Sequence, residues 1–227
     1  MKRDLKLIEH LDDLGYDEVW IGEHHSFARE IIADPVVFLA AAAQRTRQIR
    51  LGTGVLIPSN RISPVAANGL ATLAKLAPGR IDFGVGTGFT GRRTMGQGAI
   101  KLAEMERYIA EVRGLLRGET VEALLEGEKK KIRFLNPELG LIHLDSEIPL
   151  HVSAFGPNAR ALVAKLGAGW AFFSGAQAPA LGAIAGFFLA LNLATIHPLD
   201  YEPAVTFFAY SVLILGGLGS YRGVAVG

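Results

Sequence analysis

The segment VWIGEHHSF, residues 19–27, places Glu23, His24 and His25 directly after a run of apolar and small residues. The apolar run is typical of a short buried strand. Neighbouring side chains on a strand point to opposite faces, so one histidine would face whatever the strand lines while the other packs sideways. Histidine takes up a proton near neutral pH, so the inward one could act as a general base. Adjacent strand residues cannot both point at one ion, and no metal site is expected here.

A glycine-rich segment, GVGTGFTG, is the second candidate for chemistry. Its Gly86-x-Gly88-x-x-Gly91 spacing matches the dinucleotide-binding fingerprint as text. The match follows the third visible strand, however, and Gly96 and Gly98 interrupt the helix that should open there. A loop at the C-terminal end of a barrel strand, where glycines let a flat ligand approach the backbone, explains the segment better than a Rossmann fold does.

The elements that would position these residues alternate between strand and helix. Short apolar runs predict strands at 19–22, 49–56, 80–86, 148–154 and 169–174. Apolar residues at helical spacing predict helices at 3–14, 35–46, 63–76, 99–117 and 157–166. Strands separated by helices in this way imply a parallel sheet, either doubly wound or closed into a (β/α) barrel.

Local signals mark several element ends. Asp34-Pro35 and Ser63-Pro64 each predict an N-cap followed by proline at a helix start, and Gly15 suits a helix C-terminus. Residues 119–144 interrupt the alternation with short strands and a predicted turn at Gly127.

Composition excludes several classes of function. The formal net charge of the 227 residues is +1, which provides no electrostatic argument for nucleic-acid binding. The absence of cysteine excludes a disulfide framework, thiol catalysis and thiolate metal sites, and it fits a reducing compartment. The N-terminus carries no apolar signal-peptide core, so we expect a cytoplasmic protein.

The C-terminal region differs in character from the rest. Its charged side chains are Asp200, Glu202 and Arg222, so the sequence predicts a division into residues 1–178 and an apolar helical tail at 179–227. Two uncharged stretches, 179–196 and 203–221, approach the ~20 residues that span a bilayer. We expect a tail derived from a membrane protein by gene fusion, associated with a membrane. The alternative is a pair of buried helices covering an open barrel.

Several segments, in order and spacing, resemble one family. YDEVWIGEHH, DPVVFLAAAAQRTRQIRLGTGVL, SPVAANGLATLAKLAPGRIDFGVGTGF and IPLHVSAFGPNARALVAKLGAGW resemble the luciferase-like flavin-dependent monooxygenases, over about residues 3–174. The resemblance implies a TIM barrel that binds FMN, or in one branch a deazaflavin coenzyme, at its C-terminal mouth. The strand that should precede the first helix and the last strands have no counterpart. The expected fold is therefore α/β, an incomplete TIM barrel with an apolar helical tail. The ending AYSVLILGGLGSYRG resembles permease subunits of branched-chain amino-acid ABC transporters.

The family resemblance implies roles for individual residues. His24 aligns with an active-site histidine that faces the flavin and acts as a base, His25 is structural, and Glu23 orients a histidine or pairs with an arginine. In LGTGV the resemblance implies a bulge, often with a non-proline cis peptide, at Gly54–Val55, which supports the isoalloxazine ring. The implied cofactor-binding residues are Glu23, Thr53, Gly54, Val55, Gly86, Thr87, Gly88, Arg92, Arg93, Ser153, Ala154, Phe155, Gly156 and Asn158.

The phosphate site departs from the family's pattern. In SAFGPNAR, amides at a helix start would face the phosphate. Phe155, Gly156 and Ala159, however, stand where bacterial luciferase has polar phosphate contacts. Thr87 stands where it has an arginine. Arg92, Arg93 or Lys101 would supply the missing charge, although an exposed basic pair is usually just solvated.

The implied function is that of an oxidoreductase. Reduced flavin and oxygen would oxygenate a small organic substrate, with a flavin reductase supplying the reduced cofactor, and the deazaflavin branch would transfer a hydride instead. The alternatives are a non-catalytic flavin-binding fragment, favoured by the incomplete barrel, and a membrane transporter fragment, favoured by the tail. The identity of the substrate and the oligomeric state, including a homodimer, stay open.

Overall fold

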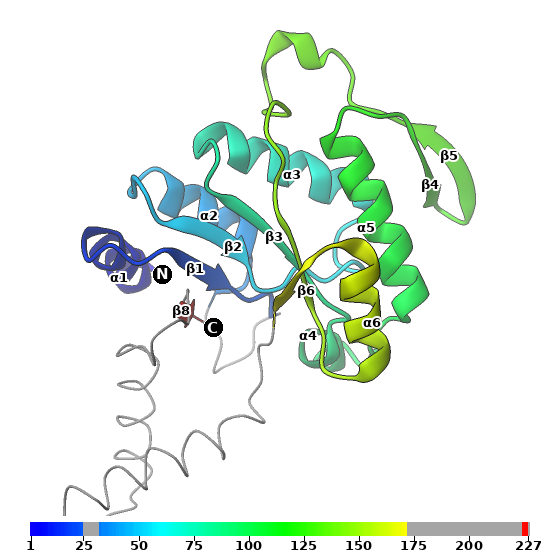
Figure 1. Ribbon diagram of the computed structural model, residues 1–227, viewed down its shortest axis with the longest axis horizontal. Helices are drawn as coiled ribbons and strands as arrows, with labels where there is room; N and C mark the ends of the chain where they lie inside the picture. Colours follow the sequence, from blue (N-terminus) through cyan, green and yellow to red (C-terminus); the bar gives the residue numbers. More distant parts are fainter. Residues whose placement is uncertain (25–31, 172–223, 227) are drawn as a thin grey trace, which may run out of the picture. The chain divides into compact units, whose positions relative to one another are not determined.

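The computed structural model describes residues 1–24, 32–171 and 224–226 (Figure 1). The chain forms two compact units, Met1–Phe172 with Ala225–Gly227, and Phe173–Val224. Almost all of the second unit lies outside the described residues, as do both apolar stretches of the predicted tail.

Five predicted strands are present in the main sheet. They are β1 (Glu18–Ile21), β2 (Arg50–Thr53), β3 (Ile81–Val85), β6 (Leu150–Ser153) and β7 (Gly169–Ala171). The order is β7-β6-β3-β2-β1-β8, where β8 (Val224–Val226) is a strand in the predicted tail. The pairs from β1 to β7 are parallel. The predicted parallel sheet is confirmed.

Helices connect these strands and cover one face of the sheet. They are α1 (Lys2–Asp13), α2 (Pro35–Ala43), α3 (Ser63–Leu76), α5 (Leu102–Leu116) and α6 (Pro157–Leu166). Figure 1 shows α2, α3 and α5 along the same side of the sheet. Their apolar faces pack against alternate strand residues such as Leu51, Phe83 and Val152, which form one buried core. The strand residues between these core positions point to the opposite face of the sheet, which these helices do not cover.

Of the three helix ends predicted from local sequence signals, two are found in the structure. The Asp34 carboxylate accepts a hydrogen bond from the Val37 N–H at 3.1 Å, as the predicted N-cap requires. Gly15, with φ +79°, follows the last residues of α1. The predicted Ser63 cap is wrong: Ile62 is the N-cap, and the Ser63 hydroxyl donates instead to Glu111 on α5 at 2.5 Å.

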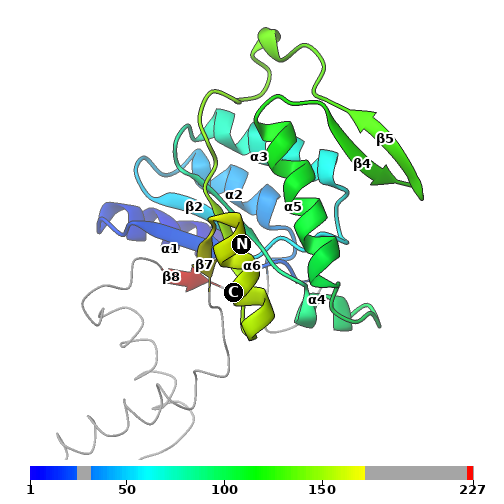
Figure 2. The same cartoon turned by 45° about the vertical axis from the view of Figure 1, so that its right-hand side comes forward.

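The excursion between α5 and β6 forms a separate hairpin. Strands β4 (Val121–Leu125) and β5 (Glu128–Ile132) are antiparallel and turn at Gly127, as predicted. A 3₁₀ helix, η1 (Pro137–Leu139), follows. Figure 2 shows the hairpin beside the C-terminal end of α5, away from the main sheet. Within the described ranges, no helix has the length and hydropathy needed to cross a bilayer.

The Asp12 carboxylate ties the end of α1 to the start of β2. It is buried and accepts hydrogen bonds from the backbone N–H groups of Arg47 (2.8 Å), Gln48 (3.0 Å) and Ile49 (2.7 Å). Burial by itself would raise the pKa of Asp12, but these three donors and the charge of Arg80 lower it below the ordinary value of 3.8.

Replacing Asp12 by asparagine is expected to lower the free energy of unfolding at neutral pH by about 2 kcal/mol, since hydrogen bonds to a charged acceptor contribute ~1.5–3 kcal/mol. The folded pKa is depressed, so this stabilisation is present above the unfolded pKa and is lost as pH falls through the folded pKa. Urea denaturation at several pH values should show the difference between wild type and Asp12→Asn shrinking below about pH 4.

The matched control for this experiment is Asp13→Asn. The Asp13 side chain is 65% exposed and pairs with Arg47 at 3.4 Å, so its replacement should change stability by less than ~0.5 kcal/mol. A difference between wild type and Asp12→Asn that stays constant as the solution is acidified would contradict the assigned role.

Candidate functional site

His24 lies on the face of the sheet that does not pack against the helices. Val19 and Ile21 of β1 belong to the helix-packed core, so Trp20 and the following even-numbered positions point to the other face, called the inner face here. A Cβ built on Gly22 would lie 3.2 Å from ring atoms of His24, which places the imidazole on that face. His25 lies outside the described residues.

Glu23 points the other way and is buried, with 3% of its surface exposed. Its carboxylate accepts a hydrogen bond from the Ile57 N–H at 2.8 Å and lies 3.7 Å from Nε of Arg61. Arg61 also donates to Asp34 at 2.7 Å. Burial raises the pKa of Glu23, although the Ile57 N–H and the Arg61 charge act against that shift. Glu23 therefore pairs with an arginine and tethers the loop after β2.

The loops after β2 and β3 meet beside His24. The Gly54–Val55 peptide is cis, which confirms the predicted bond. A Cβ on Gly86 would lie 2.7 Å from Cγ2 of Val55 and 3.3 Å from Cβ of Ser153. The structure thus brings together predicted site residues from the C-terminal ends of β2, β3 and β6.

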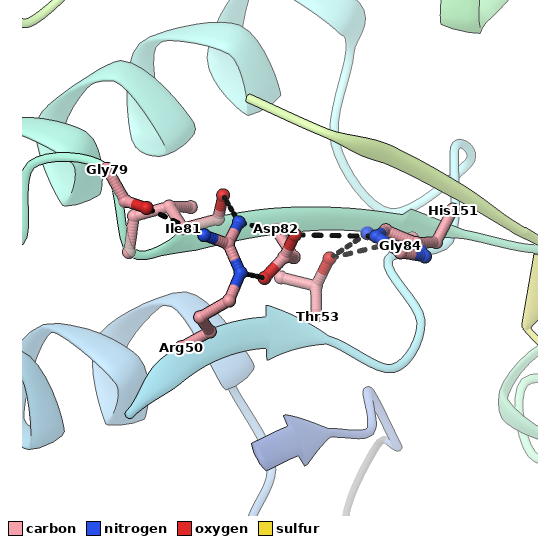
Figure 3. Close-up of polar contacts among 7 residues, drawn as sticks. All are labelled: Arg50, Thr53, Gly79, Ile81, Asp82, Gly84 and His151. Atoms are coloured by element: carbon pink, nitrogen blue, oxygen red, sulfur yellow. Dashed lines mark hydrogen bonds and ion pairs between the residues drawn. The ribbon is translucent and has the colours of Figure 1, made fainter. Parts of the chain in front are cut away.

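The Thr53 side chain joins β2 to β3. Its hydroxyl donates to the Gly84 carbonyl at 2.8 Å and accepts from the Gly84 N–H at 2.9 Å (Figure 3). The side chain is fully buried, so its contribution to the site is to hold these two strand ends in register.

The glycine-rich loop after β3 contains a short helix that the sequence did not predict, α4 (Phe89–Arg93). The Thr87 carbonyl accepts from the Ile100 N–H at 3.1 Å, and Gly88 adopts φ +75°. Nε of Arg92 donates to the Gly98 carbonyl, so this arginine is held within its own loop. The Arg93 side chain is exposed.

The predicted phosphate segment begins helix α6. Gly156 is the N-cap and Pro157 the first helical residue, while Phe155 is 52% exposed and Asn158 is exposed. Ala154 is buried, and its carbonyl accepts from the Trp170 indole N–H at 2.8 Å. Sequence reasoning therefore placed the helix start correctly.

Sequence reasoning missed an ionic layer at the N-terminal ends of the strands, on the same inner face (Figure 3). Arg50 donates to both carboxylate oxygens of Asp82 at 2.8 Å, and His151 Nε2 lies 3.4 Å from Asp82 Oδ1. Asp82 is 2% exposed. Burial and the charge of Asp82 raise the pKa of Glu18 nearby. Charged residues inside otherwise apolar strands were the available signal.

A parallel sheet covered by helices, with candidate ligand-binding groups at its C-terminal strand ends, defines a protein of the (β/α)-barrel class. The chain belongs to the luciferase-like monooxygenase family, which it matches over residues 1–187. That match runs past the predicted boundary at residue 178. The resemblance of the tail to transporter permeases finds no support.

Relatives within the family include different kinds of oxidoreductase. The chain is 43% identical over 122 residues to limonene 1,2-monooxygenase of Rhodococcus erythropolis, which covers 52% of this chain and 32% of that protein. It is 32% identical over 177 residues to an F420-dependent glucose-6-phosphate dehydrogenase of Beutenbergia cavernae, covering 72% and 50% respectively.

A solved structure confirms the predicted partial barrel. Monooxygenase RslO1 from Streptomyces bottropensis superposes with a TM-score of 0.64 at 29% identity, over 74% of this chain and 52% of that chain. The chain thus spans about half the length of that structure, half of the Beutenbergia relative and a third of the Rhodococcus relative.

Proposed function

We propose that the chain is the cofactor-binding part of a flavin-dependent monooxygenase that acts on a small organic substrate with reduced FMN and oxygen. The observation that carries the proposal is the meeting of His24, the Gly54–Val55 segment and Gly86 at the C-terminal strand ends. A separate flavin reductase would supply the reduced cofactor.

The residues at this end of the sheet fit a flat aromatic cofactor. Gly22, Gly54 and Gly86 add no side chain, so a planar ring can approach the backbone closely. Gly54–Val55 and Ser153 would hold the ring, and the half-buried His24 would hold or move a proton beside it. When bound, reduced flavin supplies the electrons that activate oxygen.

The start of α6 fits the phosphate of the cofactor. This helix has ten residues, and Pro157 at its first position leaves the N–H groups of the first turn, near Asn158, without acceptors inside the helix. The helix dipole adds partial positive charge at the same end. Arg92 and Arg93 would supply full charges from the loop after β3.

The second candidate is a hydride-transfer oxidoreductase that uses the deazaflavin coenzyme F420. It is favoured because the F420-dependent relative matches 72% of this chain, against 52% for the monooxygenase relative. Both candidates use the same end of the sheet and differ in the cofactor.

Titrating the purified full chain with FMN and with F420 tests both candidates, with binding followed by the absorbance and fluorescence of each cofactor. We expect FMN to bind more tightly. Tighter binding of F420 would favour the second candidate, and failure of both cofactors to bind would contradict the proposal. Gly86→Ala, whose methyl group would crowd Val55 and Ser153, should weaken binding of either cofactor.

Replacing both Arg92 and Arg93 by glutamine is expected to weaken FMN binding about tenfold or more while affecting riboflavin much less, because riboflavin lacks the phosphate. One charge-assisted contact contributes ~1.5–3 kcal/mol. Fluorescence titration of both ligands measures the difference. The matched control removes two cations from the hairpin, Lys131→Gln with Arg133→Gln, and should affect neither ligand. Equal losses for FMN and riboflavin would place the arginines on a solvated loop.

A further inference from the structure

Trp20 fills a space that glycines on two neighbouring strands leave open on the inner face. The strand register places Trp20 beside Gly52. A Cβ on Gly52 would lie only 2.6 Å from Cζ3 of the Trp20 indole, and a Cβ on Gly84 would lie 3.1 Å from the same atom. The benzene ring of the indole therefore lies across β2 towards β3, in contact with backbone that carries no side chains.

The ionic layer holds the indole from the N-terminal side. The Trp20 and His151 rings meet edge to face, with centroids 4.7 Å apart and an interplanar angle of 72°. His151 is in turn held by Asp82, which is fixed by the two hydrogen bonds from Arg50 (Figure 3). With 7% of its surface exposed, the indole is fixed on several sides.

On the other side of Trp20 along the chain, the His24 imidazole covers Gly22, because a Cβ on Gly22 would lie 3.2 Å from atoms of the His24 ring. Glu18, Trp20, Gly22 and His24 follow the same alternation, so Gly22 separates the indole from the imidazole and contributes no side chain. Trp20 and His24 are four residues apart, which corresponds to ~13 Å along an extended chain.

We infer that Trp20 is the floor of the proposed ligand site, the aromatic surface against which the flat ring of the cofactor rests and which limits how deeply the ring enters. This inference depends on the proposed function for the identity of the ligand. Trp20 is a positioning residue. The rigid indole fixes how far the cofactor ring lies from His24 along the strands, and the ionic layer fixes the position of the indole.

Nuclear magnetic resonance of the full chain tests this placement without any need for turnover. The chain has two tryptophans, so a ¹⁵N-labelled sample shows two indole N–H signals, which Trp170→Phe assigns. On addition of oxidised FMN, ring currents from the flavin should shift the Trp20 signal clearly more than the Trp170 signal.

Affinity provides the second measurement. Trp20→Leu should weaken FMN binding about three- to tenfold, the loss of one aromatic contact. Trp170→Leu, which removes the 56% exposed indole on β7, is the matched control and should leave the affinity within about twofold. If Trp20→Leu does not fold, the spectrum of the Trp170→Phe variant alone decides the question.

The possible outcomes separate the inference from the proposed function. FMN binding with a shifted Trp20 signal supports both. FMN binding with an unmoved Trp20 signal overturns the inference and leaves the proposed function standing. Absence of FMN binding, with unchanged spectra, contradicts the proposed function and the inference with it.

Discussion

His24→Ala is expected to lower turnover by about 10²–10⁴, the usual contribution of a general base, while leaving FMN affinity within a few-fold. The imidazole lies on the inner face, beside Gly22 and at the same end of the sheet as the cis peptide. It is therefore placed to move a proton without itself holding the cofactor. Turnover would be measured as consumption of oxygen in the presence of reduced FMN.

His25→Ala is the control for this experiment. The two histidines are adjacent in the sequence, and side chains that alternate along an extended segment cannot both reach the same ligand. Only a small loss is expected for His25→Ala. Equal losses of turnover in the two single variants would contradict the separate roles of the histidines.

Gly84→Ala is expected to destabilise the protein by about 3 kcal/mol or more, because the added methyl group has nowhere to go. A Cβ at this position would overlap the backbone carbonyl oxygen of Thr53, and backbone cannot rotate away as a side chain can. The two hydrogen bonds between the Thr53 hydroxyl and Gly84 would have to lengthen as the strands separate. Urea denaturation of the full chain measures the loss.

The matched substitution is Gly69→Ala in the middle of α3. Its Cβ would lie 3.5 Å from Cγ1 of Val36, an ordinary contact, and alanine favours a helix interior over glycine by ~1 kcal/mol. We therefore expect Gly69→Ala to be neutral or stabilising. If both alanine variants had the stability of wild type, the two strands would not be packed as closely as described.

Most elements of the fold could be predicted because their signals are local. Asp34 and Pro35 are adjacent, and the cap bond to Val37 spans a single turn. Ser63-Pro64 carries the same local signal, yet Ser63 bonds to Glu111, which lies 48 residues further along the chain. No pattern within one helix predicts such a partner, and the tertiary hydrogen bond replaced the expected cap.

The residues of the candidate site at the C-terminal strand ends could be predicted from the sequence, but the packing of Trp20 and the ionic layer could not. Strand alternation identified one inward histidine, and the family resemblance placed the cis peptide at Gly54–Val55. The contact of Trp20 with Gly52 and Gly84 depends on the register between three strands, which none of those strands encodes by itself. Arg50 and Asp82 could have been noticed as charges within apolar strands, but their pairing could not.

The order of strands along the chain also bears on how the protein is made. β1, β2 and β3 are neighbours in the sheet and follow one another in the sequence, with α2 between the first two and α3 between the second two among the described residues. During translation at ~5–20 residues per second, each of these strands would leave the ribosome within seconds of its partner. Such pairing over short sequence separations closes small loops and is comparatively fast. Strand β6, by contrast, must wait for α5 and the hairpin to be synthesised before it can join β3. A ribosome pause in the hairpin would therefore prolong exposure of the β3 edge, whereas a pause after β6 would not.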